Sequence, residues 1–175
     1  LNDFINLISR AFEENPSIIK SKEIDDNSRR ILMDALGKAA SDFRFSIYNS
    51  RFSGDKSSIY LKDITDFIDT INSFLEHTID INKRDDGLYH AYNLIEIAED
   101  SVKVSHLPEM LEGQVAILSS GYLSIEESLD ILDSLKSSKL FRDDQYSYLL
   151  YPNKDLPGFL DKNIIPASEV NKSKL

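Results

Sequence analysis

The sequence contains no cysteine and little glycine or proline. With no Cys among 175 residues, the chain has no disulfides, thiolate zinc sites, iron–sulfur clusters or cysteine nucleophiles. Six Gly and five Pro are too few for collagen, a glycine-rich linker array or a fold dominated by irregular loops. Hydrophobic residues make up 41% and charged residues 29%, which is ordinary globular composition. We therefore expect one domain over residues 1–175, burying roughly two thirds of its unfolded surface.

Long apolar runs and clustered positive charge are also missing. The longest apolar runs are short, such as 115–118, whereas a membrane-spanning helix needs about 20 residues. The net charge is −10, and even the densest basic pair, Arg29 and Arg30, follows Asp25 and Asp26. Nucleic-acid binding needs Lys and Arg gathered on one face, and an anionic membrane attracts the same groups. We expect no nucleic acid and no membrane as partners.

The first residue is Leu1 rather than Met, and no secretory signal opens the chain. From this we expect a processed product or an excised segment of a longer protein, whose other domains are then partners of this one. The missing signal and missing cysteines favour a cytoplasmic location.

Apolar spacing predicts about five helices. Their expected ranges are 2–14, 27–48, 63–80, 108–119 and 125–137. Asp25 to Asn27 supply capping groups for the second helix, and Ser124 with Glu127 forms a capping-box pattern before the fifth. Gly37 inside the second helix predicts close approach of a neighbouring helix. The last two helices are expected to form an antiparallel hairpin that buries Leu111, Val115 and Leu118 of one helix and Ile125, Leu129, Leu132 and Leu135 of the other.

Residues 92–106 alternate in polarity around Glu99 and Asp100, which predicts a β-hairpin with strands near 92–98 and 101–106. A helix continued over 88–99 is the alternative. Residues 146–151 predict a short strand, and Pro152, Pro157 and Pro166 mark an irregular tail that we expect to pack over the helices. The predicted fold class is mainly α: antiparallel helical hairpins, one small β-hairpin and an irregular C-terminal tail.

Two polar stretches rich in aromatic residues are candidate glycan-binding loops. Carbohydrate hydroxyls need planar hydrogen-bonding partners, and sugar ring faces need aromatic platforms. The candidates in the first stretch are Arg84, Asp85, Asp86, Tyr89, His90, Tyr92 and Asn93. Those in the second are Arg142, Asp143, Asp144, Gln145 and Tyr148. The alternatives are a helix end followed by an Asp-Asp-Gly turn and an edge strand with solvated charges.

No catalytic motif or cofactor signature is present. Glu109 and Glu112 fall in the first turns of the predicted helix 108–119, where the helix dipole stabilises anions without a functional reason. His90 and His106 match no helical metal-ligand spacing. The chain has no phosphate-binding glycine loop, dinucleotide fingerprint or nucleophile elbow. We expect no cofactor and no metal, and the catalytic residues, if there are any, stay unassigned.

Three segments carry a resemblance to a known class of protein. They are 84–94 (RDDGLYHAYNL), 110–116 (MLEGQVA) and 148–152 (YLLYP). Together they resemble parts of large bacterial proteins that are similar to six-hairpin carbohydrate-active enzymes of the cellobiose phosphorylase type. The resemblance covers about residues 52–166 and implies a helical-hairpin fragment whose polar loops meet a glycoside at one rim. The chain is too short for a whole toroid, and no single carboxylate matches the family's general acid, so no catalytic residue is carried over.

These observations lead to two hypotheses. In the first, the chain is a non-catalytic or partial domain of a carbohydrate-processing protein, and loops 84–93 and 142–151 lie close together and contact a glycan. In the second, it is a helical protein-interaction or inter-domain module without a ligand, in which the same aromatic residues pack on a partner. A stand-alone hydrolase would need a carboxylate pair in a cleft, which nothing in the linear spacing supports.

Overall fold

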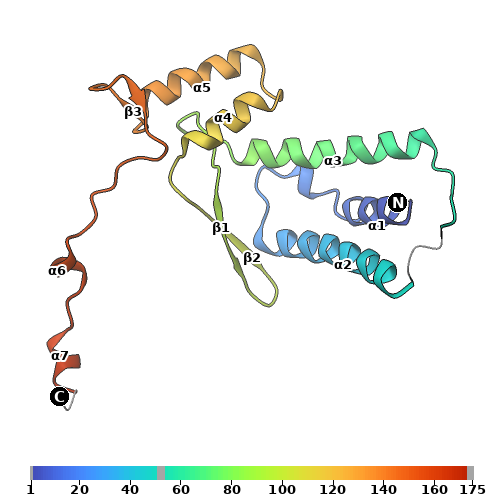
Figure 1. Ribbon diagram of the computed structural model, residues 1–175, viewed down its shortest axis with the longest axis horizontal. Coiled ribbons are helices and arrows are strands. Elements are labelled where there is room, and N and C mark those ends of the chain that lie inside the picture. Colours follow the sequence, from blue (N-terminus) through green and yellow to red (C-terminus); the bar gives the residue numbers. More distant parts are fainter. Residues whose placement is uncertain (1, 51–53, 173–175) are drawn as a thin grey trace.

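The computed structural model describes residues 2–50 and 54–172. It is mainly helical, with two small antiparallel strand pairs, as the sequence predicts (Figure 1). The elements in chain order are α1 (Asn2–Glu13), the 3₁₀ helix η1 (Ile18–Lys20), α2 (Asp26–Ser50), α3 (Leu61–Ile81), β1 (Asn93–Ile97), β2 (Val102–His106), α4 (Leu111–Ser119), α5 (Ile125–Ser137), β3 (Phe141–Arg142), β4 (Ser147–Tyr148), α6 (Phe159–Lys162) and α7 (Ala167–Val170). Residues 51–58, whose composition predicts a loop, lie partly outside the described residues.

The first packed cluster is made by α1, α2 and α3. The Phe4 ring lies 5.0 Å from the ring of Phe43 in α2, and the Phe12 ring lies 4.4 Å from that of Phe74 in α3. The α1 helix is therefore held between two longer helices (Figure 1). Asp25 caps α2, because its Oδ1 accepts a hydrogen bond from the backbone N–H of Ser28 at 2.9 Å.

The second packed cluster lies around the α4–α5 hairpin. Its buried members are Leu88, Tyr89, Ile117, Ile131, Leu135 and Leu140. The capping box that begins α5 is confirmed: Ser124 Oγ accepts from the Glu127 N–H at 3.1 Å, and Glu127 Oε2 accepts from the Ser124 N–H at 2.9 Å. This local signal placed α5 at the predicted residues.

The β1–β2 hairpin is confirmed, and the alternative helix over 88–99 is wrong. Ile95 pairs with Val104 and Glu96 with Lys103 in an antiparallel register. Two arginines of α2 hold the hairpin: Arg29 Nη1 donates to the Val102 carbonyl at 2.6 Å, and Arg30 Nη1 to the Ala98 carbonyl at 2.5 Å. The basic pair therefore has a structural role.

Two sequence expectations about the helices are wrong. The α4 helix begins at Leu111 rather than Pro108, because Met110 is extended and the Leu111 N–H donates to the Leu150 carbonyl at 2.8 Å. A Cβ at Gly37 would meet no atom within 4 Å, so no helix approaches there. The close approach is at Gly113, where a Cβ would lie 2.4 Å from Ala91 Cβ.

The expected buried face of α5 is confirmed at Leu135 and wrong at the other three positions. Ile131 and Leu135 point into the core, whereas Ile125, Leu129 and Leu132 are 76%, 57% and 48% exposed. On α4, Gln114 and Ile117 are buried and Val115 is exposed. Periodicity identified the apolar residues, but it does not show which of two apolar faces meets this chain's own core.

The tail does not pack over the helices. Pro152 is buried, but every described residue from 153 to 172 is exposed. This part of the chain, with the short helices α6 and α7, extends away from the body (Figure 1). Leu156, Phe159 and Leu160 are all exposed to solvent. The apolar composition of the tail therefore did not indicate whether it packs on the helices.

Candidate functional site

A cavity of about 550 Å³ lies between the C-terminal end of α3, residues 89–93 and one side of α4. Its lining includes four residues of the first polar stretch, Tyr89, His90, Tyr92 and Asn93, together with Ala91. The other lining residues are Thr78, Ile79, Asn82, Glu112, Gly113, Ala116, Ile117 and Ser120. The predicted aromatic and amide side chains thus share a concave surface.

Gln114 fixes the segment that forms one wall of this cavity. Its side chain is fully buried. The Tyr89 N–H donates to Gln114 Oε1 at 2.9 Å, and Gln114 Nε2 donates to the Tyr89 carbonyl at 2.8 Å. The amide therefore pairs with the Tyr89 backbone as a neighbouring strand would. Sequence reasoning missed Gln114, although a polar residue one turn after Leu111 on an apolar helix face was the available signal.

A chain of amides continues across the mouth of the cavity. Asn93 Nδ2 donates to Asn82 Oδ1 at 3.1 Å, and Asn93 Oδ1 lies 2.8 Å from His106 Nδ1. On the opposite wall the Tyr92 hydroxyl donates to Glu112 Oε2 at 3.1 Å, and this hydrogen bond raises the pKa of Tyr92. These groups are satisfied by one another, so a ligand would compete with existing hydrogen bonds. Asn82 and Glu112 were not predicted as site residues.

His90 stacks on His106 with ring centroids 3.7 Å apart and an angle of 11° between the planes. Burial, followed by the neighbouring His106 and Arg84, lowers the pKa of His90, and Asp86 opposes this. His90 Nδ1 is buried without a hydrogen-bond partner. The neutral imidazole is therefore the favoured form.

The remaining charged residues of the first stretch lie on a different side of residues 84–90. Arg84 Nη2 lies 2.6 Å from Asp86 Oδ2 and 3.4 Å from Glu109 Oε2. The hydrogen bond from Arg84 lowers the pKa of Asp86. With Leu88 and residues 133–139 of the α5 end, these three side chains line a second cavity of about 530 Å³. Asp85 is exposed and lines a third, charged cavity with His90 and His106.

The second polar stretch forms a separate small hairpin. Phe141 of β3 pairs with Tyr148 of β4, and their rings are 5.1 Å apart. Arg142 Nε donates to Asp144 Oδ1 at 2.9 Å, and this pairing lowers the pKa of Asp144. Asp143 and Gln145 are exposed in the connecting turn.

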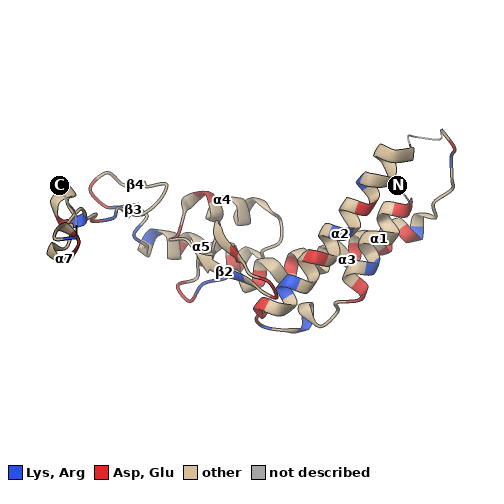
Figure 2. Ribbon diagram, turned by 90° about the horizontal axis from the view of Figure 1, so that it is seen from below, with Lys and Arg blue, Asp and Glu red and all other residues tan. Residues whose placement is uncertain are grey.

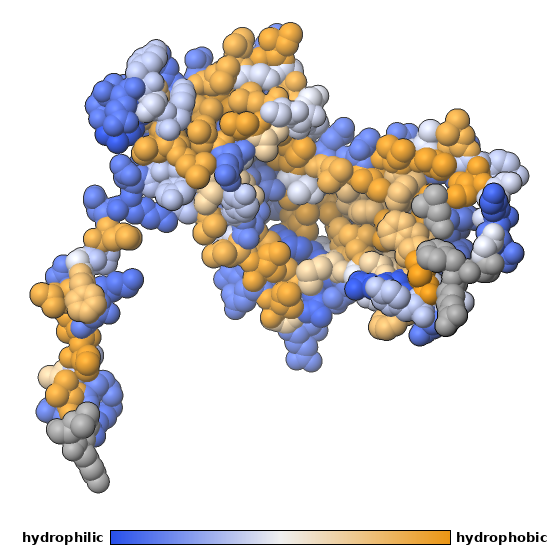
Figure 3. All heavy atoms as spheres, viewed as in Figure 1, coloured by the Kyte–Doolittle hydropathy of each residue, from blue (hydrophilic) through white to orange (hydrophobic). Residues whose placement is uncertain are grey.

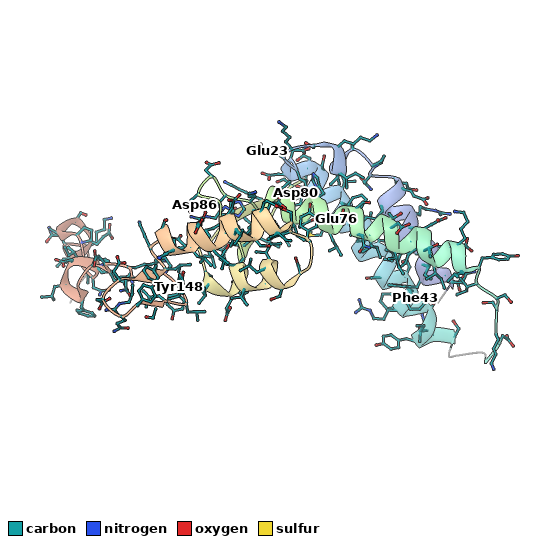
Figure 4. The ribbon with its side chains drawn as sticks, turned by 90° about the horizontal axis from the view of Figure 1, so that it is seen from above. Glu23, Phe43, Glu76, Asp80, Asp86 and Tyr148 are labelled. Carbon is teal, nitrogen blue, oxygen red and sulfur yellow. The ribbon has the colours of Figure 1, made fainter. Side chains whose placement is uncertain are left out.

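The two polar stretches do not meet. Asp86 and Tyr148 lie on opposite sides of α5 (Figure 4), and Arg142 to Gln145 and Tyr148 line none of the three cavities described above. Arg84 and Asp86 instead line a cavity with the end of α5, whereas Arg142 pairs with Asp144 inside its own hairpin, so the expected juxtaposition fails. Only the first stretch contributes to a cavity with aromatic and amide walls.

Lys and Arg are interspersed with Asp and Glu along the described chain (Figure 2). Among residues 2–50 and 54–172, no group of three or more His, Asp or Glu is placed to hold a metal ion. No helix in these two ranges has the length and apolarity needed to cross a bilayer.

An exposed apolar face is present on α5. Ile125, Leu129 and Leu132 recur at helical spacing on one face, which we call the α5 outer face. Nearby on α4, Val115 lines a shallow apolar hollow of about 320 Å³ with Leu111 and Leu150. Apolar atoms cover much of the visible surface of this region (Figure 3).

Comparison with known proteins adds no assignment. No protein-family model matches the chain, and no curated protein matches it significantly. The resemblance to six-hairpin carbohydrate-active enzymes therefore stays a prediction.

Proposed function

We propose that this chain is a helical protein-interaction module whose contact surface is the α5 outer face. The observation that carries the proposal is the mismatch between pattern and packing on α5. The residues at 125, 129 and 132 have the spacing of a buried helix stripe, yet all three are exposed. Each side chain of this type is worth about 1.5–3 kcal/mol when it is fully buried. A partner with a complementary apolar surface would recover that free energy.

The total exposed surface supports the same proposal. The chain presents 13488 Å² to solvent, whereas a compact monomer of 19.9 kDa presents roughly 8,700 Å². Part of the excess belongs to the tail. Ile68 and Leu75 of α3 and Val115 of α4 are also exposed. Exposed apolar residues that share one helix face, as on α5, are typical of protein-interaction sites.

The test is site-specific photo-crosslinking in the native cell. A photoreactive phenylalanine derivative replaces Leu129 or Leu132 in one pair of variants, and exposed Asp130 or Asp133 of the same helix in the control pair. We expect one defined protein adduct from the first pair only, and its loss when Leu129→Asp is combined with the label at position 132. Equal adducts from both pairs, or none from either, would contradict the proposal.

Glycan binding is a second candidate, and the cavity beside Tyr92 is the observation that favours it. A phenol, two amides and a carboxylate face a volume suited to one or two sugar rings. An NMR titration with a panel of neutral oligosaccharides is expected to move the amide signals of 89–93. The shifts are expected to vanish in Tyr92→Ala and persist in Tyr148→Ala. Unmoved spectra at millimolar oligosaccharide would remove this candidate.

A further inference from the structure

The two edges of the β1–β2 hairpin differ. The β2 edge is covered by α2, since Arg29 donates to the Val102 carbonyl. Of the two strands, β2 makes the main contacts with α2. Within the described residues, the backbone of Leu94 to Ile97 has no hydrogen-bond partner outside the hairpin.

The register shows which backbone groups the open edge presents. The Leu107 N–H donates to the Tyr92 carbonyl at 3.2 Å, and the Ala98 N–H donates to the Ser101 carbonyl at 2.9 Å. Even-numbered residues of this strand therefore direct their backbone groups toward β2. Antiparallel strands alternate in this respect, so Asn93, Ile95 and Ile97 direct theirs outward.

This edge carries none of the usual protection against strand pairing. Natural edge strands are shielded by Lys, Pro, bulges or a covering element. The β1 strand has no Lys or Pro, and its pairing with β2 is unbroken. Ile95 and Ile97 are 61% and 63% exposed. Its single charge, Glu96, lies opposite Lys103.

We propose that the β1 edge pairs antiparallel with β1 of a second copy of this chain, about a two-fold axis at Ile95. In that register Asn93 lies opposite Ile97 of the partner subunit, and Ile95 lies opposite Ile95 of the partner subunit. These are the residues with outward backbone groups, so every free N–H and C=O of the edge gains a partner. The result is a four-stranded sheet in the order β2–β1–β1–β2.

The side chains suit this self-pairing. On one face, Val104 and Ile95 of the two copies form a continuous β-branched row. On the other, Glu96 lies opposite Leu94 of the partner subunit rather than a second Glu96, and it keeps Lys103 beside it. No pair of like charges is placed directly opposite.

The interface is small, and this sets the expected affinity. Pairing one five-residue strand per copy buries a small area. Interfaces that bury less than roughly 1,200 Å² are typical of weak, transient complexes. Each copy also has a net charge of −10, so two copies repel each other at low ionic strength. We expect dissociation constants of about 10–1,000 μM and tighter association as salt is raised.

Disulfide trapping tests the register directly, because the chain has no cysteine of its own. The Ile95→Cys variant would place its two thiols opposite each other at a separation that a disulfide can span. We expect mild oxidation to give covalent dimer from this variant. The Leu129→Cys control on the α5 outer face is expected to stay monomeric. Dimer from Leu129→Cys alone, or from neither variant at about 1 mM protein, would overturn the proposal.

Sedimentation velocity gives an independent measurement on the unmodified chain. Ile95→Pro removes an outward N–H without removing a hairpin hydrogen bond, and it is expected to abolish concentration-dependent dimerisation. Leu129→Asp is expected to leave dimerisation unchanged, so failure of this proposal is distinct from failure of the α5 interaction surface. Circular dichroism of both variants is the check that they fold. A chain that sediments as monomer at every concentration and salt level refutes the edge pairing.

Discussion

At the scale of single residues, Gln114 stands out among the described residues as a polar side chain that is fully buried. It satisfies both backbone groups of Tyr89 from inside the core. Replacing it with leucine keeps the volume but leaves a buried N–H and a buried C=O without partners, and each such group costs about 1–3 kcal/mol. We expect Gln114→Leu to lose roughly 2–5 kcal/mol of unfolding free energy, measured by urea denaturation.

The control for this prediction is Ser119→Leu, at an exposed position near the end of the same helix. It should change stability by no more than about 0.5 kcal/mol. If the two leucine variants were equally stable, the amide would have no structural role at Tyr89.

His90 makes stability depend on pH. Its pKa in the folded chain is lowered, chiefly by burial, so the unfolded chain binds a proton more readily. Its contribution to stability is therefore fully present above the unfolded pKa of about 6.5 and is lost as pH falls through the lower folded pKa. We expect unfolding free energy to decrease from pH 7.5 to pH 5, measured by urea denaturation.

The variant His90→Gln removes the titrating group and is expected to flatten part of that decrease. Gln145→Ala, an exposed position without a titrating side chain, is the control and should keep the wild-type slope. Parallel slopes for all three chains would rule out His90 as the source.

At the scale of elements, two glycines in helices are expected to respond in opposite ways to the same change. Gly113→Ala places a methyl group 2.4 Å from Ala91 Cβ, and overpacking of this kind costs about 1–3 kcal/mol. Gly37→Ala meets nothing within 4 Å, and it should gain about 0.5–1 kcal/mol from helix propensity. Thermal unfolding of the two variants measures both effects.

Ala91→Gly provides the rescue, since it removes the atom that the new methyl group meets. The double variant Ala91→Gly with Gly113→Ala is expected to recover most of the stability lost by Gly113→Ala alone. Lack of recovery would show that the loss has another cause.

Elements were predictable where a local interaction defines them. The α5 bounds follow from Ser124 and Glu127, and the β1–β2 hairpin follows from alternation around Glu99 and Asp100. The start of α4 and the orientation of α5 were not predictable. They depend on the hydrogen bond to the Leu150 carbonyl and on which apolar face Leu88 and Leu140 meet, and both contacts join distant parts of the chain.

At the scale of the whole molecule, the exposed tail should be separable from the packed body. Pro152 is the last buried residue, and all described residues after it are exposed. Since exposed chain ends are the preferred sites of proteolysis, we expect limited proteolysis to remove the segment after about residue 152. The remaining body should keep its melting temperature to within about 2 °C, measured by calorimetry after mass spectrometry locates the cut.

Protection of the segment 156–165 would instead show that its apolar residues are covered in solution. A body that loses its cooperative transition after cleavage would assign the tail a role in folding.

The molecule-scale arrangement was the least predictable feature of the candidate site. Residue types and spacing identified Tyr89, Tyr92 and Asn93, which do line a cavity. The distance between this stretch and Tyr148 depends on where α5 lies, and no property of either stretch specifies that. The cavity also needs Asn82, which directly follows α3 and lies two residues before the predicted stretch.

The long helix α3 has a mechanical consequence. Phe74 packs with Phe12 near its middle, whereas Ile79 and Asp80 near its end join the cluster of the α4–α5 hairpin, where the Tyr122 hydroxyl donates to Asp80 Oδ1 at 2.8 Å. One continuous helix therefore connects the two clusters. Bending between them would require the loss of backbone hydrogen bonds within α3. A partner that binds one cluster is therefore held at a fixed angle to the other cluster.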